Sequence, residues 1–111
     1  MNKYFAKKVN DPDHGKFDSK DEFARFKMLL LLERVGEVTN LRRQVVYELA
    51  PAVVIKGRKH PPLRYIADFV YAEIDKEVVE DVKGGPITEG FRIKRHLMKS
   101  VHGIEIRETR M

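Results

Sequence analysis

The amino-acid sequence predicts an α/β domain in which a mixed β-sheet is flanked by helices. Two stretches with helical spacing, residues 19–36 and 88–103, enclose several stretches with the alternating pattern of β-strands. A last alternating segment, residues 104–107, follows the second helix and should pair in parallel with an inner strand, because a helix precedes it. Antiparallel hairpins and one parallel pair together make a mixed sheet.

Length and composition limit the chain to one folded domain with a basic surface. Its 111 residues suffice for a single hydrophobic core. Lys and Arg number 22 against 17 acidic residues, a formal charge of +5, which favours a polyanionic partner. No apolar run approaches the ~20 residues that span a bilayer, and no secretory signal follows the N-terminal lysines. We therefore expect a soluble, cytoplasmic protein.

Several kinds of site are excluded by residue type and spacing. The chain has no cysteine, so it has neither disulfides nor thiolate metal sites. Its four histidines are dispersed along the chain and none has the i, i+4 spacing of a helical zinc pair. No glycine-rich phosphate loop ends in Gly-Lys-Ser/Thr, so we expect no nucleotide cofactor.

The chain divides into a basic N-terminal arm, residues 1–16, and a folded domain, residues 17–111. The arm mixes lysines with turn-forming residues and shows no sustained period, which fits a loosely docked segment, either frayed or in contact with phosphates. Ser19 and Glu22 then form a capping box at the start of the first helix. Phe23, Phe26 and Leu30, together with Leu31 and Val35, predict its buried stripe, and Gly36 its end. Glu22 has two competing roles, a helix cap and a carboxylate that points toward a site, and the sequence does not choose between them.

Residues 41–55 alternate like a strand that is broken or bent at Pro51. Gln44 shares its parity with Val46, so it either faces inward, where its amide could position a water or a phosphate oxygen, or is an ordinary exposed strand glutamine. The segment after this strand, residues 56–62, predicts a turn-rich loop. Its cations Lys56, Arg58 and Lys59 are either a solvated connection or phosphate contacts.

Residues 64–84 predict two strands joined by a hairpin turn near Asp75 and Lys76. Asp68 lies in the middle of the first strand, where burial of a charge is costly. In the second strand the period of two places Asp81 and Lys83 on one face and Glu80 on the other, a choice that a bulge would reverse. Two carboxylates brought together repel unless a cation or a shared proton relieves them, so a divalent metal beside an ammonium group is expected. The alternative is a cross-strand salt bridge on a half-exposed sheet.

The second helix is expected to begin at the N-cap Thr88 and to end at Gly103. Phe91, Met98 and Val101 repeat at near-helical spacing, with Leu97 beside them. The opposite face is basic and is either a solvated surface or a contact with the DNA backbone; it carries Arg92, Lys94, Arg95, His96 and Lys99.

The chain resembles the PD-(D/E)XK nuclease superfamily in the order of these features: an aspartate in a strand, then a hairpin, then Asp/Glu-x-Lys in the next strand. The resemblance covers roughly residues 17–108. It extends to small phage-encoded members related to Holliday-junction resolvases, on a set of features in the same order: Glu22 in an amphipathic helix, Gln44 in a strand, Ala67-Asp68-Phe69, Glu80-Asp81-Val82-Lys83-Gly84, and a basic helix. It implies a restriction-endonuclease-like core.

The resemblance implies a metal-dependent endonuclease for branched DNA, a hydrolase of DNA recombination and repair encoded by a phage or prophage. Asp68 and Asp81 would bind Mg²⁺, with Mn²⁺ as a substitute, helped by the Val82 carbonyl and by Glu22. Lys83 would orient the attacking water and stabilise the anionic transition state. Symmetric paired nicks in a four-way junction need two centres, so we expect a homodimer. The alternatives are a general, nicking or flap nuclease and a non-catalytic nucleic-acid-binding module.

Overall fold

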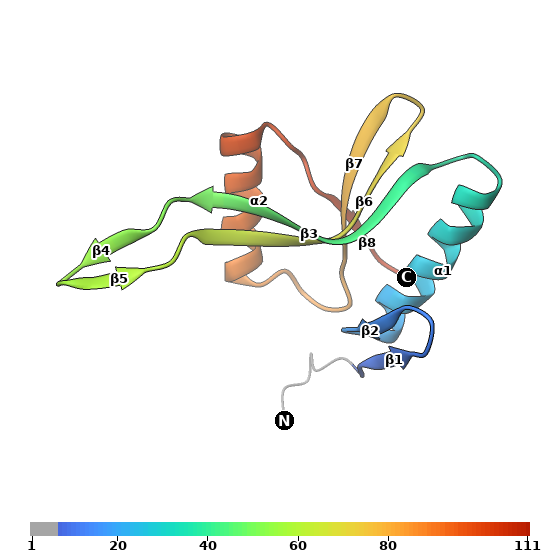
Figure 1. Ribbon diagram of the computed structural model, residues 1–111, viewed down its shortest axis with the longest axis horizontal. Helices are drawn as coiled ribbons and strands as arrows, with labels where there is room; N and C mark the ends of the chain where they lie inside the picture. The colour runs from blue at the N-terminus through green and yellow to red at the C-terminus, as the bar shows by residue number, and fades with distance from the viewer. Residues whose placement is uncertain (1–6) are drawn as a thin grey trace.

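The sheet at the centre of the structure consists of strands β3 (Thr39–Ala50), β6 (Leu63–Glu73), β7 (Lys76–Val82) and β8 (Arg107–Thr109), in that order (Figure 1). The structure is a computed structural model that describes residues 7–111. Strand β6 pairs in antiparallel orientation with both β3 and β7, whereas β8 pairs in parallel with β7. A helix packs on each side of the sheet, so the predicted mixed α/β architecture is confirmed.

Both helices begin at the caps that the sequence indicates. The Ser19 hydroxyl accepts a hydrogen bond from the Glu22 amide at 3.0 Å and starts α1 (Lys20–Arg34). The Thr88 hydroxyl accepts one from the Phe91 amide at 3.1 Å and starts α2 (Glu89–His102). Gly103 ends α2 in the left-handed conformation, with φ of 70°. Within the described residues, neither helix is long and apolar enough to cross a bilayer.

The buried stripes of the helices differ in part from the prediction. In α1, Leu31 and Val35 are exposed and Leu29 is fully buried instead. Four consecutive leucines at 29–32 leave the phase of the stripe ambiguous, and packing selects Leu29 because it lies one turn from the buried Phe26. In α2, Phe91 and Met98 are buried as predicted, but Val101 is exposed near the end of the helix.

Two hydrophobic cores lie on opposite faces of the sheet. The first packs α1 against the sheet through side chains that include Phe26, Leu29 and Phe69. The second packs α2 against the other face through Phe91, Met98 and Val79 among others. Each helix therefore buries its apolar side against one face, as in other α/β layer structures.

Strands β3 and β6 change the face that they bury halfway along their length. In β6, Phe69 belongs to the α1 core, although Ala67, two residues earlier, belongs to the α2 core. In β3, Leu41 packs on the α1 core and Val45 on the α2 core. Gln44 lies between them with φ of 54°, in the left-handed region, which rotates the chain and bends the strand. Because β6 is hydrogen-bonded to β3, it follows this bend.

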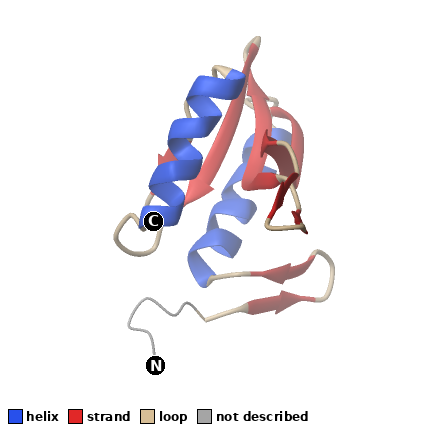
Figure 2. Cartoon of the chain, turned by 90° about the vertical axis from the view of Figure 1, so that its left-hand side faces the viewer, coloured by secondary structure: helices blue, strands red, loops and turns tan. Residues whose placement is uncertain are grey.

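The N-terminal segment forms a short hairpin of β1 (Val9–Asp11) and β2 (Gly15–Phe17) beside the start of α1 (Figure 2). Residues 1–6 of the predicted arm lie outside the described residues. The remaining part is not a loosely docked coil. Phe17 is buried, and the Arg43 guanidinium donates to the backbone oxygens of His14 at 3.0 Å and Lys16 at 2.7 Å. The sequence prediction missed this hairpin because its strands are only three residues long.

A second hairpin, β4 (Val53–Ile55) and β5 (Arg58–His60), extends outward from the ends of β3 and β6 (Figure 1). The predicted loop at residues 56–62 is therefore partly a strand. Lys56 and Gly57 form the turn with φ of 51° and 75°, the left-handed pair that two-residue hairpins favour. Prolines at 51, 61 and 62 cannot donate to a ladder, so they separate this hairpin from the main sheet.

The last strand lies later in the chain than predicted. Ile104 and Ile106 pack on the α2 core without joining a strand, and β8 covers Arg107–Thr109 instead of residues 104–107. Its parallel pairing with β7 is as predicted.

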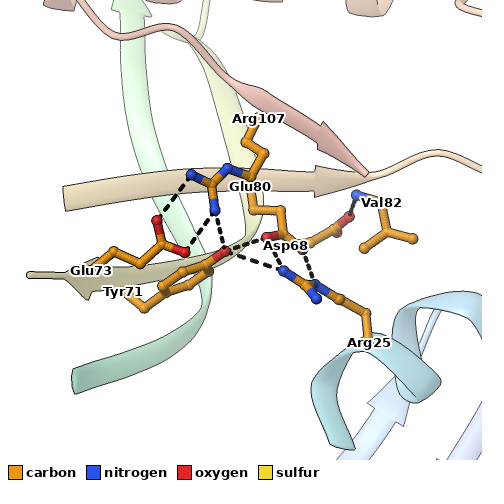
Figure 3. A network of polar contacts seen from close by, with 7 residues as sticks. All are labelled: Arg25, Asp68, Tyr71, Glu73, Glu80, Val82 and Arg107. Atoms are coloured by element: carbon orange, nitrogen blue, oxygen red, sulfur yellow. Dashed lines mark hydrogen bonds and ion pairs between the residues drawn. The ribbon is translucent and has the colours of Figure 1, made fainter. Parts of the chain in front are cut away.

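A buried ionic network on the α1 side holds these elements together (Figure 3). The side chain of Glu80 is fully buried in β7 and accepts two hydrogen bonds from Arg25 of α1, at 2.7 and 3.1 Å, and one from the Tyr71 hydroxyl of β6 at 2.5 Å. Arg107 of β8 donates to the same hydroxyl at 3.2 Å and pairs with Glu73 at 3.0 and 3.1 Å. One buried carboxylate thus connects α1 to three strands.

Replacing Arg25 by Ala should lower the free energy of unfolding by about 3 kcal/mol, because it leaves the Glu80 carboxylate buried without its cation. Urea denaturation followed by circular dichroism measures this loss. The matched control is Arg42→Ala, which removes an exposed pair with Glu77 and should change little. Equal losses in the two variants would show that the network does not stabilise the fold.

Candidate active site

Asp68 and Asp81 meet because their strands form one tight hairpin. Phe69 of β6 pairs with Glu80 of β7, and Glu73 pairs with Lys76 across the two-residue turn. One step beyond the Phe69–Glu80 pair, the same register places Asp68 opposite Asp81. The two aspartates therefore lie side by side where the antiparallel ladder ends.

Asp81 is buried, with 7% of its surface exposed, and both of its oxygens have protein partners. The Tyr65 hydroxyl donates to Oδ1 at 3.0 Å, and the Lys83 ammonium lies 2.5 Å from Oδ2. Burial, followed by the charge of Asp81, raises the pKa of the Tyr65 phenol, so Tyr65 remains a donor. Asp81 and Lys83 thus share one face, as their spacing predicts.

Lys83 is fixed at both ends. Its backbone amide donates to the Thr109 oxygen of β8 at 2.7 Å, and its ammonium lies 3.2 Å from the centre of the Phe91 ring. The aromatic face and the Asp81 carboxylate together hold the positive charge at the edge of the carboxylate cluster. A lysine held in this way can contact an anionic group that approaches Asp81.

Asp68 is the most perturbed acid of this group. Its Oδ2 accepts a hydrogen bond from the Val82 amide at 2.8 Å (Figure 3). Burial, with repulsion from Asp81 and Glu22, raises the pKa of Asp68 to about 8. In the absence of a cation, Asp68 therefore keeps its proton at neutral pH.

Of the two roles that the sequence left open, the Glu22 side chain takes the one toward the site, because among the described residues its carboxylate accepts no hydrogen bond from the first turn of α1. The Glu22 amide takes part in the Ser19 cap, and its side chain, 3% exposed, reaches the hydrogen-bonding range of Asp68. Burial raises the pKa of Glu22, and Asp18 adds to this rise. Arg43 lies 3.5 Å from Oε2 and favours the ionised form, so Asp68 is the member of the pair that holds the proton. Among the described residues, this Oε2 makes no hydrogen bond.

Glu80 lies on the opposite face, in the Arg25 network, and no bulge reverses the parity between it and Asp81. Gln44 does not face inward. It is exposed beside Asp68 in the neighbouring strand and has the left-handed backbone described above. A non-glycine residue in this conformation stores backbone strain, which is more frequent at functional sites than elsewhere.

The residues predicted to contact DNA divide into two groups. Lys56, Arg58 and Lys59 lie in the β4–β5 hairpin, and the other group lies along α2 and consists of Arg92, Lys94, Arg95 and Lys99. All are exposed except Arg95, which is partly buried. Neither group contacts the carboxylates directly.

The carboxylates supply the hard oxygen ligands that Mg²⁺ requires. Within residues 7–111, no group of three or more His, Cys, Asp or Glu side chains is arranged so that it could hold a metal ion. Mg²⁺, however, is commonly held by one or two carboxylates and retains several waters. The raised pKa of Asp68 reflects burial and the negative charges around it, and Oε2 of Glu22 accepts no hydrogen bond among the described residues; a bound cation would relieve both. The residues therefore fit a magnesium site.

A cavity elsewhere in the described part of the molecule does not coincide with this cluster. It has a volume of about 540 Å³ and is lined by the first half of β7, the end of α2 and the segment before β8. Asp81 lies at the other end of β7. A carboxylate cluster that lies at the end of a strand, outside this cavity, suits a large substrate that approaches from outside better than a small enclosed one.

Sequence reasoning missed two residues that shape the site. The Tyr65 hydroxyl donates to Asp81. The period of two in the sequence places Tyr65 on the same strand face as Ala67, but it does not predict the bend that brings this face close to Asp81. Arg43 stacks on Phe17 at 3.7 Å and faces Glu22, a contact between segments 21 residues apart in the chain. No local pattern signals such a contact.

The chain belongs to a family of proteins of unknown function, DUF1064, whose model matches residues 1–109. No curated protein and no solved structure matches it.

The raised pKa of Asp68 predicts a pH-dependent effect of Asp68→Asn. Because the pKa is about 8 in the folded state and 3.8 ordinarily, folding favours the protonated form. The stability that protonated Asp68 contributes to the fold is fully present below pH ~4 and is lost as the pH rises through ~8. Asparagine mimics the protonated acid, so Asp68→Asn should stabilise the metal-free protein by up to about 5 kcal/mol at pH 8 and by less than about 1 kcal/mol at pH 4.

Urea denaturation in EDTA at both pH values measures the difference, and the exposed Asp75→Asn serves as the control. If the free energies of unfolding of the variant and the unsubstituted protein differ by the same amount at pH 8 and at pH 4, Asp68 is ionised in the metal-free fold at pH 8.

Proposed function

We propose that this DUF1064 protein is a Mg²⁺-dependent endodeoxyribonuclease for branched DNA, specifically a Holliday-junction resolvase of the PD-(D/E)XK type. The observation that carries the proposal is the meeting of Glu22, Asp68 and Asp81 with Lys83 in a chain of formal charge +5. Acids that converge at one exposed strand end of a basic protein oppose DNA binding unless a cation joins them.

The order of the elements supports the proposal. The helix with Glu22, the strand with Gln44, the strand with Asp68, the strand with Asp81 and Lys83, and the basic helix α2 follow one another as the resemblance requires. They surround one site although they span most of the chain. This agreement is the basis for proposing a restriction-endonuclease-like core.

Each residue has a role consistent with its contacts. Asp68 and Asp81 would hold Mg²⁺ or Mn²⁺, with the Val82 carbonyl and Glu22 as further ligands. A bound Mg²⁺ would supply Lewis-acid neutralisation of the phosphate charge. Lys83, held between Asp81 and Phe91, would orient the attacking water and stabilise the anionic transition state. Gln44, exposed beside Asp68, would position a phosphate oxygen.

Two alternatives follow from particular observations. A general, nicking or flap nuclease would use the same site, since junction selectivity rests on the resemblance alone. A non-catalytic nucleic-acid-binding module is the alternative if the Lys83–Asp81 pair is purely structural, because in this pair the lysine already neutralises one candidate ligand.

The proposed activity predicts paired, symmetric nicks in a labelled immobile four-way junction in Mg²⁺ and none in EDTA. Asp81→Asn should reduce the cleavage rate by at least about 100-fold through loss of metal-borne transition-state stabilisation, and Lys83→Ala by a similar factor. Gel electrophoresis of end-labelled strands measures both.

Linear duplex, flap and single-stranded substrates serve as controls, with Asp75→Asn as the matched aspartate variant. Equal cleavage of every substrate would indicate a general nuclease. Tight binding without cleavage under any metal would indicate the non-catalytic module.

Two coordinated nicks also predict a homodimer with a two-fold axis, because one chain presents one carboxylate cluster of this kind. Gel filtration with light scattering should give about twice the chain mass of 13.0 kDa. A monomer at working concentrations, with paired nicks still observed, would contradict the dimer.

A further inference from the structure

The surface of the β4–β5 hairpin, residues 53–60, and of the adjoining strand ends carries basic side chains without acidic ones. Between Glu48 and Asp68 the sequence contains no acidic residue. It contains Lys56, Arg58, Lys59 and Arg64, all of them exposed. In the described part of the chain none of these four cations forms an ion pair with an acidic side chain.

The basic face of α2 differs in this respect, because three of its four Lys and Arg side chains form ion pairs, with Lys94 as the exception within the described residues. Arg92 pairs with Glu89 at 2.5 Å, Arg95 with Glu108 at 3.1 Å, and Lys99 with Glu105 at 3.6 Å. These acids would have to be displaced or would repel a phosphate close to their partners. The hairpin cations can contact phosphates without that cost.

The hairpin is also in line with the candidate active site. Strands β3 and β6 run from Gln44 and Asp68 outward to β4 and β5, along the longest dimension of the molecule, 52 Å (Figure 1). Nine residues separate Lys59 from Asp68, which corresponds to about 30 Å of extended chain. One turn of B-DNA is ~34 Å long. A duplex bound at Asp68 could thus meet the hairpin about one helical turn away.

We infer that the β4–β5 hairpin is a DNA-binding arm that enters the major groove of the duplex about one helical turn from the cleaved phosphate. The inference rests on the proposed function for the position of that phosphate. A two-stranded ribbon fits the major groove. Lys56, Arg58 and Lys59 contact phosphates at its walls, and the exposed Val53, Val54 and Ile55 lie against base edges and sugars.

A second copy of the chain is the competing occupant, because the three apolar residues of β4 are exposed. The charge pattern argues against it. Two such arms packed against each other would bring six unpaired cations together, Lys56, Arg58 and Lys59 of each copy, without an acid on either arm. DNA supplies the opposite charge that this surface lacks.

The test compares two triple variants in an Asp81→Asn background, which prevents cleavage. Lys56→Ala/Arg58→Ala/Lys59→Ala removes the arm cations, and Arg92→Ala/Arg95→Ala/Lys99→Ala removes three paired cations of α2, an equal change in charge. Binding of a labelled four-way junction in Ca²⁺ is measured by fluorescence anisotropy from ~50 to 200 mM salt. Circular dichroism establishes that both variants fold.

The arm variant should bind about 10- to 100-fold more weakly at ~150 mM salt, with a slope of log K against log salt that is shallower by about 3. The α2 variant should lose less affinity and less slope. An α2 variant that loses as much as the arm variant, or more, overturns the inference.

A second measurement places the arm on the DNA. Because the chain has no cysteine, His60→Cys with catalytic residues intact gives a single thiol for a photo-crosslinker. Crosslinks should map about 10 base pairs from the nicks that the same protein makes. Crosslinks next to the nicks, or none, overturn the inference, as does a change in the oligomeric state of the arm variant.

The two proposals can fail separately. Cleavage that is insensitive to the arm substitutions refutes the arm alone. Arm-dependent binding without cleavage in any metal refutes the nuclease and leaves a DNA-binding arm on a non-catalytic module.

Discussion

The change of buried face at Gln44 and Asp68 is the constraint on which the candidate site depends. A regular strand presents alternate residues to fixed faces, so one aspartate could not lie near both α1 and the α2 side of β7. The left-handed Gln44 bends β3 and the paired β6 at this level. Asp68 consequently lies where the two cores meet, close to Glu22 from one side and Asp81 from the other. The strain at Gln44 is offset by the packing of both cores.

The buried acids of this protein are satisfied in different ways, and the difference separates structure from proposed chemistry. Glu80 has a bidentate arginine and a tyrosine hydroxyl, so it is fully paired in the absence of any ligand. Burial instead raises the pKa of both Asp68 and Glu22, and one Glu22 oxygen has no hydrogen-bond partner in the described chain. Incomplete pairing of buried groups destabilises a fold and is retained mainly where a ligand completes it. This contrast distinguishes the candidate site from the ionic network one strand face away.

Local patterns in the sequence predict the parts of the structure that depend on neighbouring residues. The caps Ser19 and Thr88, the hairpin after Tyr71 and the shared face of Asp81 and Lys83 all follow from short-range rules. Other features depend on distant packing and could not be predicted. The leucine run at 29–32 has no unique helical phase, Gln44 carries no signal for a left-handed backbone, and Arg43 reaches a hairpin far from it in the chain. The β4–β5 hairpin was missed because prolines at both its ends resemble those of a loop.

Strand β8 has a kinetic consequence for the candidate site. It gives Lys83 its backbone partner, and its Arg107 reaches Tyr71 in the buried network. Because β8 follows α2 in the chain, this parallel pairing closes a long loop, and we expect it to form later than local contacts do. The hairpin of β6 and β7 can form early from local contacts, with its aspartates already adjacent. The lysine is fixed last, so a folding intermediate would hold the acids without the positioned cation.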